Sequence, residues 1–162
     1  MLAELLATAV LICIDPGHGT VPAVGAQREP VGPGAATTKI KDGGGAPGEA
    51  EVALAIATRT GALLRARGYA VVLTRTGPGY RGGNRERAET CNAAHATLML
   101  RIHADGSADP AQHGASTLVP AWHRGWTDDI YARSARAGQL VETALVRATG
   151  RSEEHTSELQ SH

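Results

Sequence analysis

The 162-residue chain contains no phenylalanine, and its aromatic residues are limited to three tyrosines and two tryptophans. Glycine is abundant, with 20 residues, and nearly all of the basic residues are arginine. This mixture is typical of a GC-rich coding sequence, so the missing phenylalanine reflects the genome more than the fold. Because 42% of the residues are hydrophobic, the chain can still bury one core, which predicts a single domain.

The chain also lacks net charge, since 16 basic side chains are balanced by 16 acidic ones. No global electrostatic field would therefore draw it onto nucleic acid or anionic lipid. Any partner has to be recognised at a local site.

Cysteine is scarce, and long hydrophobic runs are missing. Cys13 and Cys91 are too few for a disulfide framework and lack the paired spacing of a zinc knuckle. We expect both to be buried free thiols, because free cysteine is among the most buried residues. The opening segment 1–15, "MLAELLATAVLICID", contains Glu4 and has no cationic start. It therefore matches neither a signal peptide nor a membrane span.

Short apolar runs alternate with longer helical patterns, which predicts an α/β fold with a largely parallel sheet. Strands are predicted at "AVLICID", "YAVVLTRT", "TLMLRIHADGS" and "ASTLVPA", residues 9–15, 69–76, 97–107 and 115–121. Helices are predicted at residues 49–68, 85–96 and 128–150. No internal repeat or coiled-coil heptad is visible.

The predicted helix 49–68 is amphipathic, and Gly68 is placed to end it. Its apolar face is expected to consist of Val52, Ile56, Leu63 and Leu64. Asp128 or Asp129 is expected to cap the last helix. Residues 19–48 are rich in Gly, Pro and Ala and have no period, so a long loop is predicted there.

Polar residues just beyond the carboxyl ends of parallel strands are the first candidates for a ligand site. His18 follows the first strand in "IDPGHGT", and His103 closes the third in "LRIHADG". Glu49 stands at the start of the first helix. Taken singly, each residue has an ordinary structural explanation. His18 would be a turn residue, His103 would hydrogen-bond a nearby carbonyl, and Glu49 would interact with the helix dipole in the first turn. Together, two histidines and a glutamate with an open fourth position are typical of a catalytic zinc site.

Four stretches resemble a known family in the same order: "ICIDPGHG", "GEAEVALAIATRTGALLRARGYAVVLTR", "RERAETCNAA" and "LMLRIHADGS". This family is the zinc-dependent N-acetylmuramoyl-L-alanine amidases of the bacterial cell wall (amidase type 3 catalytic domain). The resemblance covers residues 11 to 149, and "HGASTLVPAW" and "WTDDIYARSARAGQLVETAL" look especially like the actinobacterial members. It implies a single α/β domain whose mostly parallel or mixed twisted sheet is flanked by helices.

The resemblance also implies a ligand set for one Zn²⁺ per domain. His18 matches the family's first ligand, Glu49 the middle one and His103 the last. Glu51, displaced by two residues, remains the alternative for the middle ligand. Two further matches to basic positions of the family, Arg75 and Arg87, are expected to pack and form ion pairs around the sheet.

The implied activity is hydrolysis of the amide bond between the lactyl group of N-acetylmuramic acid and the L-alanine of the stem peptide. In the family, the general base is a glutamate in a "VE-x-G-F" context on a late strand, and this chain contains no such stretch. Glu142 lies in a "LVETAL" segment that resembles a covering helix, so it is not expected to be the base. The catalytic residue is therefore unknown, and we expect this chain to be inactive.

The closing residues 151–162, "RSEEHTSELQSH", back-translate to a common sequencing adapter. We expect them to be non-native, and residues 1–150 to be an amidase domain that is missing its C-terminal strand or strands. The lost pairing would leave an exposed edge, lower the stability and favour association.

Three readings of the function follow. The first is a peptidoglycan amidase, which by resemblance acts outside the cytoplasmic membrane and is a monomer in its intact form. The second is an inactive fragment that binds zinc and peptidoglycan. The third, an unrelated α/β zinc carboxypeptidase, is disfavoured because the motif context is that of the amidases. No sequence feature favours a nucleic-acid partner or membrane insertion.

Overall fold

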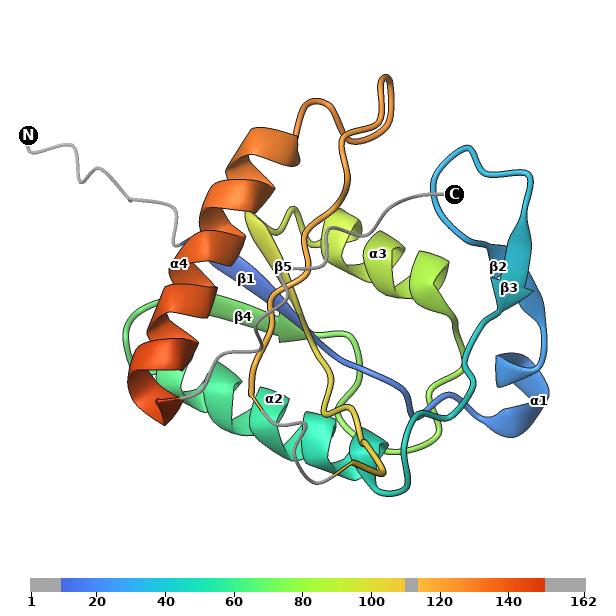
Figure 1. The fold of residues 1–162 in the computed structure, drawn as a ribbon, viewed down its shortest axis with the longest axis horizontal. Helices are drawn as coiled ribbons and strands as arrows, with labels where there is room; N and C mark the ends of the chain where they lie inside the picture. Colours follow the sequence, from blue (N-terminus) through green and yellow to red (C-terminus); the bar gives the residue numbers. More distant parts are fainter. Residues whose placement is uncertain (1–9, 110–113, 151–162) are drawn as a thin grey trace, which may run out of the picture. The chain divides into compact units, whose positions relative to one another are not determined.

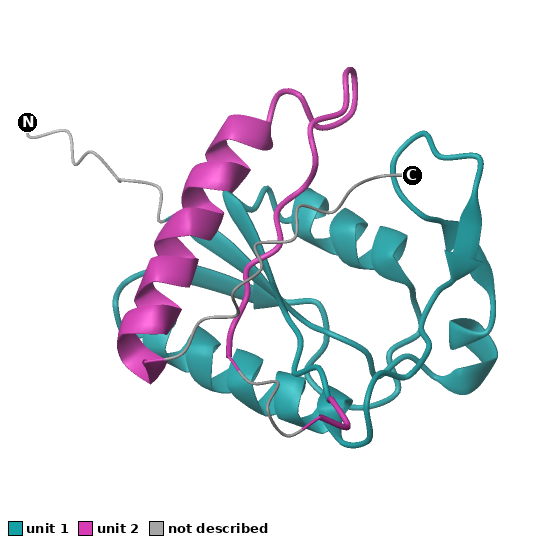
Figure 2. Ribbon diagram, viewed as in Figure 1, with its two compact units in different colours: residues 1–106 teal, residues 107–162 magenta. Residues whose placement is uncertain are grey.

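The computed structural model describes residues 10–109 and 114–150 of the chain. They fall into two compact units, one up to Gly106 and one from Ser107 onwards (Figure 2). Most of the opening segment and the whole of residues 151–162, for which a non-native origin is expected, lie outside the described residues.

The first unit is built on a three-stranded parallel sheet in the order β4-β1-β5 (Figure 1). Its strands are β1 (Leu11–Pro16), β4 (Ala70–Leu73) and β5 (Leu98–Ile102). Ile12 of the central strand lies opposite Val71 on one side and Leu98 on the other. All but the first residue of β1 are buried, as a strand covered on both faces requires. The predicted α/β fold with a parallel sheet is therefore confirmed.

Helix α2 (Glu49–Arg65) covers one face of this sheet, where Ile12 and Ile14 pack against Ala57 and Leu64. The buried residues of α2 are Glu49, Ala53, Ala57 and Gly61. Small side chains let the helix approach closely, since a Cβ on Gly61 would lie 3.4 Å from the Leu73 side chain. The face of α2 that packs on the sheet is therefore a stripe of small residues.

The predicted apolar face of α2 is wrong in three of its four members. Val52, Ile56 and Leu63 are 47%, 44% and 51% exposed, and only Leu64 packs against the core. The prediction chose these residues for their hydrophobicity. How closely α2 approaches the sheet, however, depends on the size of the side chains between them. The predicted stop is confirmed, because Gly68 has a φ of +88° just after the helix end.

Helix α3 (Asn84–Ala93) lies on the other face of the sheet and is joined to β1 by a Cys13–Cys91 disulfide. Successive strand side chains point to opposite faces, so Cys13 points away from the face formed by Ile12 and Ile14. The expectation of free thiols is wrong, although both cysteines are buried. Their Cα atoms lie 5.5 Å apart despite a sequence separation of 78, which sequence spacing alone does not reveal.

The predicted long loop 19–48 contains short regular elements. These are α1 (Pro22–Gly25) and an antiparallel hairpin of β2 (Arg28–Pro30) and β3 (Thr38–Ile40). Strands of three residues are too short to give a readable period, so the sequence showed only loop composition.

Glu29 joins the hairpin to the start of α3. Its buried carboxylate accepts hydrogen bonds from the Asn84 backbone N–H at 2.9 Å and from Lys39 Nζ at 3.1 Å. A carboxylate at this position also interacts favourably with the helix dipole.

The second unit contains α4 (Tyr131–Thr149), which is followed by Gly150 at a φ of +67°. The predicted strand at 115–121 is wrong, because this segment has no regular secondary structure. It packs on α4 instead: a Cβ on Gly138 would lie 2.5 Å from the Val119 side chain. Thr117 donates a hydrogen bond to Glu142 Oε2 at 2.8 Å, so Glu142 has a structural partner within this unit.

The N-cap of α4 is Ile130 and neither predicted aspartate. Asp128 instead accepts a hydrogen bond from the Gly125 N–H at 3.0 Å, which stabilises the turn before the helix. Within residues 10–109 and 114–150, no helix is both long and apolar enough to cross a lipid bilayer.

Candidate metal centre

His18 lies in a tight turn after β1. The Gly17 N–H donates to the Ile102 carbonyl at 2.8 Å, so the turn begins against the end of β5. His18 has a φ of +54°, in the left-handed region that few residues other than glycine adopt, and Gly19 follows at +82°. Such a conformation persists only where surrounding contacts hold it.

Glu49 is the first residue of α2, after a left-handed Gly48. Its side chain is buried and accepts backbone hydrogen bonds from Ala46 at 2.9 Å and from Ala104 at 3.2 Å. Burial acts to raise the pKa of Glu49, but these bonds and the one from His103 outweigh it and lower the pKa. Glu49 is therefore ionised at neutral pH.

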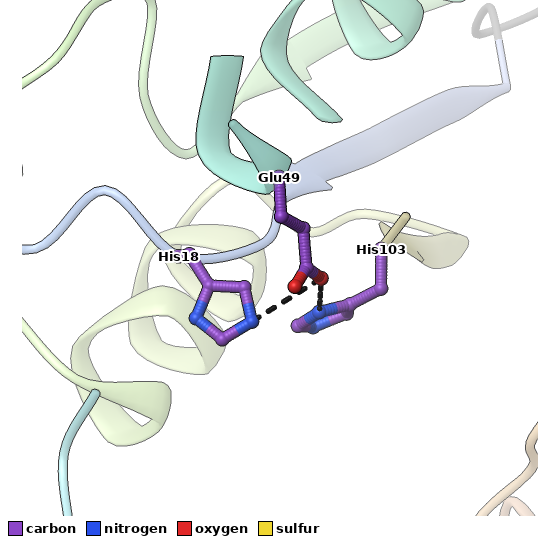
Figure 3. Close-up of side chains that lie close together, drawn as sticks. All are labelled: His18, Glu49 and His103. Atoms are coloured by element: carbon purple, nitrogen blue, oxygen red, sulfur yellow. Dashed lines mark hydrogen bonds and ion pairs between the residues drawn. The ribbon is translucent and has the colours of Figure 1, made fainter. Parts of the chain in front are cut away.

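His103 directly follows β5, and it meets the other two side chains at the carboxyl edge of the sheet (Figure 3). Glu49 Oε1 lies 2.9 Å from His103 Nδ1 and 3.3 Å from His18 Nε2. The two imidazole rings meet edge to face, with centroids 4.7 Å apart. One nitrogen or oxygen atom from each residue lies within 4.8 Å of the others. The structure thus brings together the three residues that the sequence nominated, whereas Glu51 is exposed and outside the group.

Asp42 is a member of the site that the sequence reasoning missed. Its Oδ1 lies 2.7 Å from His18 Nδ1, and its carboxylate also accepts backbone hydrogen bonds from Thr20 and Gly44 at 3.0 and 2.8 Å. Burial acts to raise the pKa of Asp42, but the bonds from His18, Gly44 and Thr20 prevail and lower it to about 2. Asp42 is thus a fixed anion behind His18.

The donor set fits a zinc ion. Imidazole nitrogens and a carboxylate oxygen are ordinary zinc ligands, and three of them leave a fourth position open. A metal-bound histidine commonly donates its second ring N–H to a carboxylate, which is the place of Asp42 beside His18. Glycines make room for the group, since a Cβ on Gly45 would lie 2.4 Å from Glu49 Oε2 and 2.6 Å from His18 Cδ2.

A pocket of about 330 Å³ opens beside the two histidines. Besides His18, His103 and Asp42, its walls include the basic side chains of Lys39, Lys41, Arg87 and Arg101. Within residues 10–106 of the first unit, the carboxylates paired with the two histidines are those of Glu49 and Asp42. Glu142 belongs to the second unit, where it is bonded to Thr117.

Arg75 and Arg87, which were both expected to pack and form ion pairs, differ in their partners. Arg87 does form an ion pair, with Nη1 2.7 Å from Asp15 Oδ1, and the same buried carboxylate binds Arg101 Nε at 2.5 Å and the Thr74 hydroxyl. Arg75, by contrast, forms no ion pair with a carboxylate of the described residues. Its guanidinium binds backbone carbonyls.

Comparison with known sequences gives a consistent result. The sequence model of the N-acetylmuramoyl-L-alanine amidase family matches residues 12–160. The N-acetylmuramoyl-L-alanine amidase AmiA of Salmonella typhimurium is 36% identical over 146 residues, which cover 87% of this chain and 43% of AmiA. The chain thus spans less than half the length of this curated relative.

Solved structures show the same fold. The N-acetylmuramyl-L-alanine amidase Ami1 of Mycobacterium smegmatis superposes with a TM-score of 0.72 at 24% identity, covering 88% of this chain and 66% of Ami1. The amidase AmiC2 of Nostoc punctiforme gives a TM-score of 0.55 at 21% identity, covering 94% and 74% of the two chains. At these identities the likeness establishes the fold alone.

Proposed function

The chain belongs to the N-acetylmuramoyl-L-alanine amidase family, and from this membership we propose that it is a zinc-dependent amidase domain. Its substrate is peptidoglycan, and the bond cleaved is the amide between N-acetylmuramic acid and L-alanine. The observation that carries the proposal is the convergence of His18, Glu49 and His103, with Glu49 buried and ionised.

His18, Glu49 and His103 would hold the zinc ion. When bound, zinc polarises a substrate carbonyl and lowers the pKa of bound water towards neutrality. The chain's own residues orient this centre: Asp42 accepts from His18 Nδ1 and so directs Nε2 towards Glu49. The pocket of about 330 Å³ beside the histidines gives the muramyl peptide room to reach the metal.

The second candidate function is binding of zinc and peptidoglycan without hydrolysis. The supporting observation is that, within residues 10–106 of the first unit, the carboxylates paired with the two histidines are those of Glu49 and Asp42. A general base must lie within hydrogen-bond reach of the proton that it removes. In this proposal Glu49 serves as a zinc ligand and Asp42 is paired with His18, so neither supplies this role. In both functions, the protein acts outside the cytoplasmic membrane, and the intact protein is a monomer.

The test measures zinc stoichiometry, peptidoglycan binding and amide hydrolysis on the same preparation. Zinc binding at about one ion per chain, with zinc-dependent release of stem peptide from muropeptides, would establish hydrolysis and overturn the expectation that this chain is inactive. Zinc binding and co-sedimentation with peptidoglycan, without release, would establish the binding function. A chain that binds no zinc would refute the proposed centre, and a His18→Ala variant with unchanged stoichiometry would remove His18 from it.

A further inference from the structure

Arg75 is a buried cation that binds peptide carbonyls on its own segment and on two others. Its side chain projects from the chain just after β4, and the residue is 6% exposed. Burial, followed by the nearby charge of Arg87, lowers the pKa of Arg75. Burying a cation is costly unless hydrogen bonds and opposite charges compensate for it. Four hydrogen bonds to backbone carbonyls and the nearby charges of three carboxylates, Asp15, Asp42 and Glu51, do so here.

Three of the four carbonyls that Arg75 binds lie within two residues of His18 or Glu49 in the sequence. Nε donates to the Pro16 carbonyl at 3.0 Å, and Nη2 donates to the Gly17 carbonyl at 2.7 Å. These two residues directly precede His18. The same Nη2 donates to the Ala50 carbonyl, also at 2.7 Å, and Ala50 directly follows Glu49. One nitrogen therefore joins the histidine turn to the first turn of α2.

The turn is also shaped around this guanidinium. A Cβ on Gly19 would lie 2.9 Å from Arg75 Cζ, so only glycine allows the chain to pass so close. On the other side, Arg87 Nη2 donates to the His18 carbonyl at 2.7 Å. The left-handed backbone of His18 is thus held from both sides, as an otherwise disfavoured conformation requires.

We propose that Arg75 is a positioning residue of the metal centre, which sets the spacing between His18 and Glu49 through the carbonyls of Gly17 and Ala50. The proposal rests on the proposed zinc function. A guanidinium suits this task because its nitrogens lie in a rigid planar fork, whereas the single ammonium of lysine cannot reproduce that geometry. Without Arg75 all three ligands are still present, but the distance between His18 and Glu49 is no longer fixed.

The experiment compares zinc affinity and thermal unfolding of the whole chain with Arg75→Gln, Arg75→Lys and the control Arg65→Gln. Arg65 lies at the other end of α2 and donates to the Val71 carbonyl at 3.0 Å, so it also links the helix to β4 but far from the ligands along the helix. Zinc affinity is measured by chelator competition. We expect about 10- to 100-fold weaker binding in Arg75→Gln, partial recovery in Arg75→Lys and no change in Arg65→Gln.

The zinc-induced rise in Tm separates positioning from a purely structural role. A structural role would lower the Tm of the metal-free and zinc-loaded forms equally, whereas positioning also reduces the difference between them. Unchanged zinc affinity in both Arg75 variants overturns the proposal, as does failure of both variants to fold. If only Arg75→Gln fails to fold, Arg75→Lys decides the question by the same comparison. A wild-type chain that binds no zinc would instead refute the proposed function, so the two failures are distinguishable.

Discussion

Asp42 Oδ1 lies 2.7 Å from His18 Nδ1, while His18 Nε2 faces Glu49 at 3.3 Å. The carboxylate therefore fixes which nitrogen of His18 is available to a metal ion. Metal-bound histidines are commonly oriented in this way, and the outer carboxylate raises the basicity of the ligand.

Asp42→Ala should weaken zinc binding by about 10- to 100-fold, because the imidazole of His18 loses the acceptor that orients it. Asp42→Asn should have a smaller effect, since its amide oxygen can still accept from Nδ1. Chelator competition measures both affinities. The control is Glu89→Gln, which removes an exposed carboxylate paired with Arg85 and should leave zinc binding unchanged. Equal affinities of wild type and Asp42→Ala would contradict the orienting role.

The choice between Glu49 and Glu51 as the middle ligand can be decided directly. Glu49→Gln should abolish high-affinity zinc binding, because an amide is a much poorer zinc ligand than a carboxylate. Glu51→Gln should bind zinc like the wild type, since Glu51 is exposed and lies outside the group. Metal content after dialysis measures the outcome. Loss of zinc in Glu51→Gln alone would reverse the assignment.

Sequence patterns were sufficient to nominate His18 and His103, because each follows a strongly apolar run and the ends of parallel strands share one edge of the sheet. Glu49 was nominated from its place in a family motif. Asp42 carried no such signal: an aspartate before three glycines in an aperiodic segment is what an ordinary turn also looks like. Its role depends on a loop that returns to the site 24 residues after His18.

The three strands of the parallel sheet and the long helices could be predicted from the sequence. The long-range contacts between them could not. The strands around Ile12 gave a clear apolar pattern, whereas the three-residue strands beside Glu29 gave none. Pairing of Cys13 with Cys91 depends on which face of β1 meets α3, which is a property of the assembled sheet. The buried face of α2 was misjudged because Ala57 and Gly61 are small rather than strongly hydrophobic.

The Cys13–Cys91 disulfide should contribute measurably to stability, since it closes a loop across a sequence separation of 78 residues. Replacing both residues, as Cys13→Ala with Cys91→Ala, should lower the free energy of unfolding by about 2 to 5 kcal/mol. Urea denaturation with and without reductant measures this loss. Reductant should destabilise the wild type but not the double variant. A wild type that is insensitive to reductant even after unfolding and refolding in it would show that the bond contributes nothing.

Glu86 should make the free energy of unfolding depend on pH in the acidic range. Its hydrogen bonds from Lys41 Nζ at 2.8 Å and from the Gly83 N–H at 2.7 Å lower the pKa of Glu86 from 4.5 to about 2. Because the folded pKa lies below the unfolded one, the stabilisation is complete above pH 4.5 and disappears as the pH falls towards 2. The side chain is 39% exposed, so solvent screening limits the effect to about 1 kcal/mol.

The measurement for Glu86 is urea denaturation at a series of pH values between 7 and 2. The wild type should lose more unfolding free energy over this range than Glu86→Gln, which has no carboxylate to protonate. Glu89→Gln, which removes an exposed acid of the same helix, serves again as the control and should follow the wild type. Identical pH profiles of wild type and Glu86→Gln would mean that the contacts of Glu86 do not stabilise the folded chain.

Gly17 should be required for the position of His103. A Cβ at residue 17 would lie 2.6 to 2.8 Å from three atoms of the His103 ring, which is closer than non-bonded atoms can approach. Gly17→Ala therefore has to displace the imidazole from its position beside Glu49, and zinc affinity should fall about 10-fold or more. Gly32→Ala is the matched control, because a Cβ there meets no atom within 4 Å. Zinc titration of both variants, with circular dichroism to show that each is folded, decides the point. If Gly17→Ala binds zinc as tightly as Gly32→Ala, either the imidazole can move without cost or His103 is not a ligand. Measuring zinc binding by His103→Ala distinguishes these two explanations.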